Sequence, residues 1–238
     1  SDESYDRKKA LLQQQIKASE GLRQVGDLMV AAFFDAKKPK ERADKQQVYL
    51  AMLSGAFEDD GLQDSVREIR ERLAAGEKGI TPFHWQLEFP EVFGEKRGGF
   101  DILIGNPPFL GGNRIWGELG KGYPDWLEQA FCKSGGKAVD LSVFFFRKCG
   151  LLISYNGSLS LISTNSVVEG DSRSAGIGYL VRSGFKIYSA DPSFRWPGAA
   201  AVIACRISMT KQNIVTQSKL RDKPVEGINS RLLPTRNE

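Results

Sequence analysis

The chain has 238 residues, of which 26% are charged and 41% hydrophobic, and its formal net charge is +4. This composition predicts a globular protein with a buried core and excludes wholesale disorder, and no apolar run reaches the length of a membrane-spanning helix. The first residues, SDESYDRKKALLQQQ, contain no apolar signal core, so we expect a cytoplasmic protein.

Residues 1–79 contain apolar residues at helical spacing and no strand signal, so they are predicted to form a helical region. Helices are expected over about 10–34, Asp44–Phe57 and 65–75. Pro39 separates the first two, Asp64 is expected to cap the third, and Gly76 is expected to end it.

Residues 80–210 alternate between strand and helix signals, which predicts an α/β sheet with an antiparallel edge. We expect, in chain order, a short strand and loop in 83–93, a strand at Phe100–Ile104, a helix at Pro124–Phe131, a helix capped by Asp140, a turn at Asn156-Gly157, a strand at Ser158–Ser163, a helix near Gly178–Arg182, a strand at Phe185–Ala190 and its hairpin partner at Ala199–Ser208. The run Phe100–Ile104 is almost continuously apolar, so it is expected to be buried on both faces. Residues 211–238 are expected to be a polar tail or linker.

Charge is unevenly distributed along the chain. Residues 1–80 carry 14 basic and 15 acidic side chains, whereas the remainder carries 19 and 14. A mildly basic second part is compatible with a nucleic-acid backbone as partner, although a solvated surface of mixed charge has the same signature.

Cysteine and histidine are scarce. The cysteines, Cys132, Cys149 and Cys205, stand far apart without a CxxC pair, which is typical of reduced thiols and not of a zinc site. His84 is the only histidine, so a Ser-His-Asp triad is not expected. We therefore predict no metal.

The most informative segment is Asn106-Pro107-Pro108-Phe109, because it directly follows a predicted buried strand. Ligands of open α/β sheets bind beyond the carboxyl ends of the strands. Two successive prolines fix the backbone and remove two N–H donors, and Asn106 is held extended by the proline that follows it. The result is a stiff loop that presents oxygen acceptors, although Asn-Pro-Pro also occurs in plain turns.

Such a loop suits a planar amine with two N–H donors, for example the exocyclic amine of adenine. The side-chain oxygen of Asn106 and the main-chain oxygen of Pro107 can each accept one hydrogen bond. These bonds draw the nitrogen lone pair out of ring conjugation, so that it can attack an electrophilic methyl group. Phe109 offers a flat surface for stacking of the base. The four residues Asn106, Pro107, Pro108 and Phe109 are our candidate catalytic residues.

The segment GGFDILIGNPPF resembles motif IV of amino-group DNA methyltransferases that make N6-methyladenine. Three further segments are similar to the large restriction–modification and phage-defence members of that family, and they occur in the family's order: FHWQLEFPEVF before motif IV, VDLSVFFFRKCGLLISYNGSLSLISTNS at motifs V and VI, and DPSFRWPGAAAVIACRIS at motif VIII. The resemblance spans about residues 80–210. It implies a Rossmann-like S-adenosylmethionine-dependent methyltransferase sheet with an antiparallel C-terminal hairpin.

The resemblance also implies an activity and its partners. A methyl group would pass from S-adenosylmethionine to an adenine flipped out of double-stranded DNA. Phe194 would pack against the extruded ring, although a core aromatic at a strand end is an equal alternative. Arg195 and Trp196 in the expected hairpin loop, and Arg114 just after the candidate catalytic loop, are candidates for DNA contacts. Asp140 resembles the start of motif V, but a helix cap is the simpler interpretation of this residue.

One feature of the family is missing. Its glycine-rich motif I, typically Asp-Pro-x-x-Gly-x-Gly, binds the cofactor and precedes motif IV, yet no such run occurs in this sequence. The cofactor-binding residues are therefore unknown. The chain resembles the C-terminal half of a catalytic domain, which a longer chain or a separate polypeptide would complete with the cofactor-binding half and the target-recognition domain.

Two alternatives stay open from the sequence. Enzymes that methylate a protein glutamine amide or a guanine amine in RNA also use an Asn-Pro-Pro-aromatic loop. A subunit that binds DNA or a partner without catalysis is the other alternative, and the missing glycine motif favours it.

Overall fold

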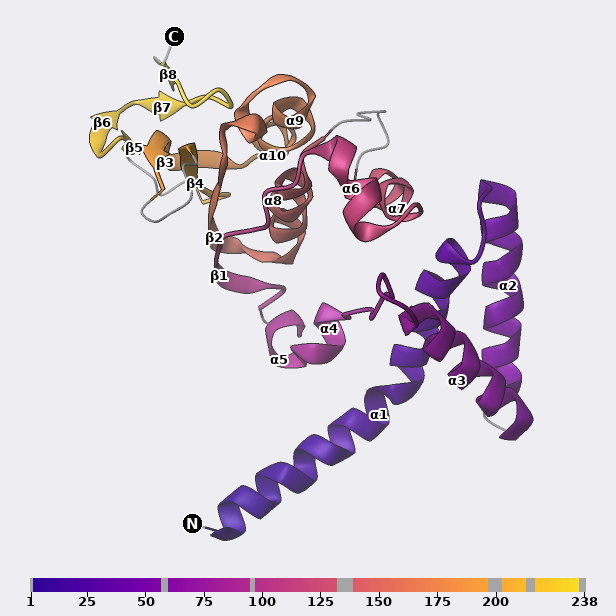
Figure 1. The fold of residues 1–238 in the computed structure, drawn as a ribbon. Helices are drawn as coiled ribbons and strands as arrows, with labels where there is room; N and C mark the ends of the chain where they lie inside the picture. Colours follow the sequence, from indigo (N-terminus) through magenta and orange to yellow (C-terminus); the bar gives the residue numbers. More distant parts are fainter. Residues whose placement is uncertain are drawn as a thin grey trace. The chain divides into compact units, whose positions relative to one another are not determined.

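The computed structural model describes residues 2–56, 60–94, 97–131, 139–196, 203–212 and 217–235. The chain forms two compact units, Ser1–Pro90 and Glu91–Glu238, which are described separately (Figure 1). In this described part, no helix combines the length and the apolar character needed to cross a membrane.

The first unit contains α1 (Asp2–Phe34), α2 (Pro39–Ala56) and α3 (Asp60–Ala74), so the predicted helical region is confirmed. Their buried core consists of Leu28, Ala31, Ala32, Tyr49, Leu53, Val66 and Ile69. α2 begins at Pro39, earlier than predicted, because proline is well suited to the first helical position. The predicted cap at Asp64 is wrong, since this residue lies inside α3 and pairs with Arg67 at 2.7 Å.

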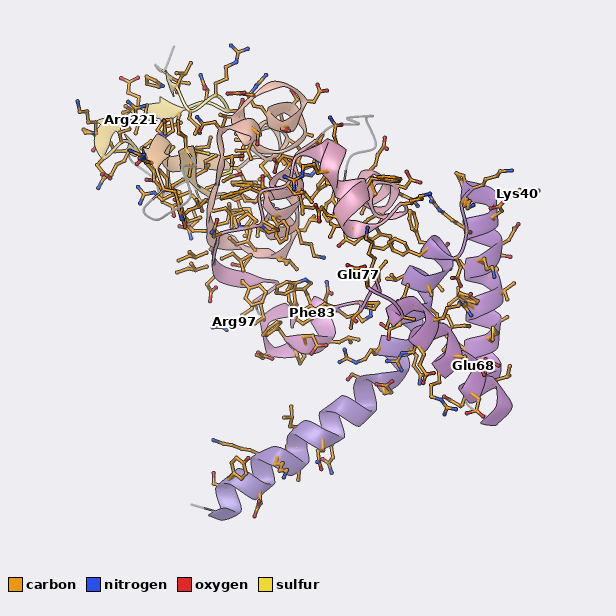
Figure 2. All side chains as sticks on the ribbon, in the orientation of Figure 1. Lys40, Glu68, Glu77, Phe83, Arg97 and Arg221 are labelled. Carbon is orange, nitrogen blue, oxygen red and sulfur yellow. The ribbon has the colours of Figure 1, made fainter. Side chains whose placement is uncertain are left out.

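Residues 83–93 form two single helical turns, α4 (Trp85–Glu88) and α5 (Pro90–Phe93), and not the expected strand and loop. The rings of Trp85 and Phe89 stack at 5.8 Å between centroids, and Phe83 packs edge-on against Trp85 at 5.0 Å; Figure 2 labels Phe83. An i, i+4 aromatic pair meets on a helical turn but not on a strand, which explains the difference.

A charged cluster joins this aromatic segment to α1. The buried carboxylate of Asp27 accepts a hydrogen bond from Nε of Arg70 at 2.7 Å and contacts Nε2 of His84 at 2.8 Å. Gly26 makes room for the imidazole, because a Cβ at this position would lie 2.3 Å from Cε1 of His84. The only histidine is therefore a structural residue of the helical unit.

The second unit is built around a mixed sheet. Its elements are β1 (Phe100–Gly105), α6 (Gly112–Leu119), α7 (Tyr123–Phe131), α8 (Leu141–Leu152), β2 (Ile153–Thr164), the 3₁₀ turn η1 (Asn165–Val168), α9 (Gly170–Ala175), α10 (Ile177–Arg182), β3 (Lys186–Arg195), β4 (Ile203–Thr210), β5 (Ser218–Leu220), β6 (Lys223–Val225), β7 (Gly227–Ile228) and β8 (Pro234–Thr235). The strand order of the main sheet is β1-β2-β4-β3-β5-β6, and β7 and β8 form a separate pair.

Strand directions in the main sheet follow from its pairing. β1 runs parallel to β2, β4 is antiparallel to both β2 and β3, and β5 is parallel to β3. Strands β1, β2, β3 and β5 therefore point the same way, and their carboxyl ends share one rim. The predicted α/β class with an antiparallel C-terminal hairpin is confirmed.

The core of this unit lies on one face of the sheet. Leu159, Leu161, Ile207 and Met209 are buried there among side chains from α8 and α10. β1 differs from expectation because it is an edge strand of the described sheet: Leu103 packs on the core, whereas Ile102 and Ile104 on the opposite face are 66% and 80% exposed. The strand is thus buried on one face only.

Other expectations also need correction. Asn156-Gly157 is not a turn but part of β2, which runs unbroken from Ile153 to Thr164. Residues 211–238 are not simply a polar tail, because they contain β5 to β8 and the buried side chains of Ile228 and Leu232. Of the expected hairpin partner, residues 199–202 lie outside the described residues, and β4 begins at Ile203.

Candidate functional site

The loop Asn106–Gly111 leaves the carboxyl end of β1 and leads into α6. Pro107 is buried, Asn106 and Pro108 are exposed, and Phe109 is half-buried. No hydrogen bond joins the Asn106 side chain to another described residue. The buried proline anchors the backbone of the loop, so Asn106 lies at the rim with its amide exposed and its oxygen able to accept a hydrogen bond.

A backbone hydrogen bond fixes the far end of this loop. The carbonyl oxygen of Leu110 accepts from the N–H of Leu141 at 2.8 Å, and Leu141 is the first residue of α8. The loop and the start of α8 are therefore one structural unit, although 30 residues separate them in sequence.

Asp140 caps α8, as predicted, and it does so from a buried position. One carboxylate oxygen accepts from the N–H and hydroxyl of Ser142 at 2.9 and 2.6 Å, and the other accepts from the hydroxyl of Ser166 at 3.2 Å. The Asp140 N–H donates to the hydroxyl of Ser172 at 3.2 Å. Hydroxyl donors and the N-terminus of α8 thus stabilise a buried carboxylate that has no cation beside it in the described residues.

This hydroxyl network reaches the end of β2. Ser163 donates to the hydroxyl of Ser142 at 2.9 Å, and Thr164 and Ser166 share a hydrogen bond of 2.7 Å. The network therefore holds together the carboxyl end of β2, the start of α8 and, through Leu110, the loop of Asn106.

Asn165 follows β2 directly and was not among the sequence candidates. Its side-chain oxygen is buried and has no hydrogen-bond partner among the described residues. Buried polar atoms are nearly always paired, so an unpaired one at this rim marks a place where a ligand or water can donate. The available signal was a polar residue two positions after the predicted strand Ser158–Ser163.

The structure places the remaining candidates elsewhere on the rim. Phe194 and Arg195 end β3, half-buried and exposed respectively, and Trp196 follows half-buried. Because β3 is three strands away from β1, these residues are offset by about 14 Å across the sheet from the loop of Asn106. Their contact with a base stays a prediction.

Arg114 lies closer in sequence to the loop, on α6. Its guanidinium is exposed and pairs with Glu118 at 3.4 Å. Two residues further, the indole of Trp116 is 54% exposed, with the amine of Lys121 5.6 Å from the ring centroid. α6 thus presents a cation and an aromatic ring to solvent next to the candidate loop.

Both described cysteines are poor nucleophiles. Burial raises the pKa of the Cys149 thiol to about 11 and that of the Cys205 thiol to about 12. A thiol reacts as its thiolate, so neither side chain is set up for covalent catalysis at neutral pH.

The described residues do not make up a complete site for S-adenosylmethionine. β1 is the outermost strand of the described sheet, and the sequence contains no Asp-Pro-x-x-Gly-x-Gly run. Among the described residues, this rim presents the exposed amide of Asn106 and the unpaired side-chain oxygen of Asn165 as hydrogen-bond acceptors, and a contact of the Pro107 carbonyl with a target amine stays a prediction.

Comparisons with known proteins place these features in context. The family model described as Eco57I restriction-modification methylase matches residues 33–177, more than half of the chain. Among 28 solved chains that match is the Type IIL restriction-modification enzyme MmeI, whose structure is in complex with DNA. The TM-score is 0.52 and the identity 22% over 67% of this chain and 23% of that chain, so the likeness concerns the fold, and this chain spans under a quarter of MmeI. None of the curated proteins searched matches.

Proposed function

Because this chain belongs to the Eco57I restriction-modification methylase family, we propose that it supplies the target-base side of a methyltransferase acting on the N6 amine of adenine in DNA. The observation that carries the proposal is the exposed amide of Asn106 beside the buried Pro107, at the carboxyl end of a parallel strand. S-adenosylmethionine is the methyl donor that this activity requires.

The chemistry of the loop favours an amine that is bound through its hydrogens. The oxygens of Asn106 and Pro107 accept one hydrogen bond each from the exocyclic NH₂, and Phe109 stacks against the ring, a contact worth about 1–3 kcal/mol per base. The acceptors then stabilise positive charge as it develops on the nitrogen. No residue with a shifted pKa is needed at the amine.

Double-stranded DNA is the proposed substrate. The similar enzyme MmeI, a restriction-modification enzyme, has a structure in complex with DNA, and the family model that matches this chain describes a restriction-modification methylase. An adenine inside a duplex cannot reach the loop, so the base has to be flipped out. We assign Phe194 to packing against the flipped base and Arg114, Arg195 and Trp196 to contacts with the surrounding DNA.

The cofactor-binding half is proposed to come from residues outside these 238, in a longer chain or a separate polypeptide. Two features of β1 support this proposal. Parallel strands are usually covered on both faces, whereas Ile102 and Ile104 on one face of β1 are largely exposed. β1 also lies at the edge of the described sheet. A further parallel strand paired with β1 would cover its open edge and place its own carboxyl end beside Asn106. A target-recognition domain is expected to be added in the same way.

The test is substitution of Asn106 in the enzyme reconstituted with its cofactor-binding half. Asn106→Ala is expected to reduce N6-methyladenine formation at least 100-fold, with DNA affinity changed less than about threefold. Asn113→Ala, at another exposed asparagine seven residues after Asn106, is the matched control. Mass spectrometry of digested nucleosides reads out the product, and retained turnover in Asn106→Ala would refute the assigned role.

The same experiment separates the alternatives. Methylated glutamine in peptides or methylated guanine in RNA would redirect the proposal to another amine. The missing glycine-rich loop favours a binding subunit without catalysis, and this alternative gains if no reconstituted complex methylates any substrate. Calorimetric titration of the chain alone with S-adenosylmethionine is expected to give no tight binding.

A further inference from the structure

The hairpin of β5 and β6 has an unusual turn. Ser218–Leu220 pairs antiparallel with Lys223–Val225, and Arg221 and Asp222 are the two connecting residues, with φ of 50° and 60°. Positive φ at both central residues defines the tight hairpin turn in which Asn-Gly or Gly-Gly is usual. Here both residues carry Cβ atoms, so the backbone is strained at two consecutive positions.

The same turn concentrates positive charge. Lys219, Arg221 and Lys223 are all exposed, and none of them forms an ion pair with another described residue. Asp222 is the one acidic residue between them. Figure 2 labels Arg221 on this hairpin. A glycine at position 221 would relieve the backbone strain, yet the sequence has an arginine there.

Strand register places Arg221 on the row of the candidate catalytic loop. Leu220 pairs with Ala190, and the N–H of Arg221 donates to the carbonyl oxygen of Ala190 at 2.9 Å, so Arg221 follows at the level of the next residue of β3, Asp191. That level continues through Arg206 of β4 to Ile162 of β2, as the pairs Asp191 with Arg206 and Arg206 with Ile162 show.

Asn106 completes this row. Gly105 pairs with Leu161, so Asn106 follows at the level of Ile162. β1 and β5 run in the same direction, and four strand spacings separate them in the sheet order. The turn of Arg221 and the loop of Asn106 therefore face the same rim, about 19 Å apart.

We propose that the basic tip of this hairpin, Lys219, Arg221 and Lys223, contacts the phosphate backbone of the DNA that carries the target base. The proposal rests on the proposed function and adds a second contact to it. Successive phosphates of one strand are about 3.4 Å apart along the helix axis, so a separation of about 19 Å corresponds to five or six nucleotides from the flipped base. Three exposed cations on a narrow hairpin match a phosphate backbone in charge, and phosphate contacts fix the register of a protein on the duplex.

Two glycine substitutions at adjacent positions test the proposal without risk to the fold. Arg221→Gly removes a cation and relieves strain, whereas Asp222→Gly relieves strain and keeps all three cations. Both variants are expected to raise the melting temperature of the chain. Only Arg221→Gly is expected to weaken binding to a fluorescein-labelled duplex, by about threefold to tenfold at low salt, while Asp222→Gly binds as tightly as the wild type or more tightly.

Salt dependence gives the second readout. Loss of one phosphate contact lowers the slope of log affinity against log salt by about one, and Arg221→Gly combined with Lys223→Gln is expected to lower it by about two. Lys40→Gln, at an exposed lysine of the helical unit that Figure 2 also labels, is the control and is expected to leave the slope unchanged.

Each outcome bears on a different claim. Unchanged affinity and slope in the hairpin variants, with Asn106→Ala still abolishing methylation, would overturn the hairpin contact alone. Weaker binding of Asp222→Gly by the same factor as Arg221→Gly would also overturn it, because the turn geometry and not the charge would then be responsible. A chain that binds no duplex at any salt concentration would contradict both the hairpin contact and the proposed function.

Discussion

The N–H of Leu141 donates a 2.8 Å hydrogen bond to the carbonyl oxygen of Leu110, so the loop that carries Asn106 is fastened to the first turn of α8. Asp140, the buried N-cap residue of α8, stabilises this first turn of the helix. The position of the candidate catalytic amide therefore depends on a carboxylate that need not contact any substrate. A residue of this kind acts by positioning, and its substitution should affect both stability and the order of the loop.

Asp140→Ala is expected to destabilise the second unit by about 2–4 kcal/mol, because it removes the helix cap and leaves the buried hydroxyl of Ser142 and the half-buried hydroxyl of Ser166 without their acceptor. Asp140→Asn keeps one acceptor oxygen and should cost about half as much. Urea denaturation measures the loss, and hydrogen exchange of the loop peptide should increase in both variants. Asp171→Ala, at an exposed position of α9, is the control. Equal stability of Asp140→Ala and this control would contradict the buried network.

A second prediction concerns the close approach of β1 and β2. A Cβ at Gly157 would lie 2.6 Å from the carbonyl oxygen of Phe100 and 2.5 Å from Cγ1 of Ile153. Gly157→Ala is therefore expected to push the strands apart and to lower the melting temperature by several degrees, as overpacking typically costs about 1–3 kcal/mol. Gly117→Ala in α6 meets no atom within 4 Å and should stabilise the chain by about 0.5–1 kcal/mol. Thermal unfolding of both variants, measured side by side, tests the prediction, and an unchanged melting temperature in Gly157→Ala would contradict it.

The raised thiol pKa values predict slow and pH-dependent labelling. In a Cys132→Ser variant, which leaves the two described cysteines, reaction with a disulfide reagent at pH 8 should be at least tenfold slower in the native chain than in urea. The native pKa values, about 11 for Cys149 and about 12 for Cys205, exceed the ordinary value of 9.0. The folded state thus holds these protons more tightly, so stability should fall as pH rises from about 9 towards 11 or 12. Labelling at pH 8 as fast as in urea would show that the thiols are not buried.

Local signals in the sequence were sufficient for much of the site. Asp140 before an apolar run indicated a helix cap, and the apolar run ending at Gly105 indicated the strand that carries Asn106. Both features depend on interactions between residues close together in sequence, so a short segment is enough to predict them. The three N-terminal helices and the α/β sheet were predictable for the same reason.

What could not be predicted depends on contacts between distant segments. The unpaired oxygen of Asn165 is visible only once the hydroxyl network around it is known, and the exposure of Ile102 and Ile104 follows from β1 lying at the edge of the described sheet. Polar residues 211–238 gave no apolar periodicity, yet β5 is paired by backbone hydrogen bonds to β3, which require no particular side chains.

The exposed edge of β1 predicts self-association of the isolated chain. An open strand edge with large apolar side chains is a template for pairing with another chain. Ile104→Lys is expected to reduce light scattering and the apparent mass in sedimentation, with stability changed by less than about 0.5 kcal/mol because the side chain is 80% exposed. Leu151→Lys, at a 68% exposed position on α8, removes a similar apolar area away from the edge. If Leu151→Lys reduced association equally, general stickiness and not the strand edge would be responsible.

The contact between Gly26 and His84 makes a quantitative prediction for the helical unit. In the wild-type background, Gly26→Ala should destabilise α1 by about 1–3 kcal/mol, because its methyl group would lie 2.3 Å from the imidazole and displace it from Asp27. In a His84→Ala background the obstacle is gone, and the same substitution should stabilise α1 by about 0.5–1 kcal/mol through its higher helix propensity. The sign of the effect is thus expected to reverse with the residue at position 84.

Native-state hydrogen exchange of α1 peptides in the wild type and the three variants completes this double-mutant cycle and reports local stability without requiring the whole chain to unfold as one unit. Asp27 also accepts a 2.7 Å hydrogen bond from Arg70, which none of the substitutions removes, so the carboxylate is expected to retain a partner and the comparison isolates the glycine–histidine pair. Additive effects of the two substitutions would mean that the imidazole does not rest on Gly26. A reversal of sign would show that this glycine is required by the close approach of the histidine ring and not by any need for flexibility in α1.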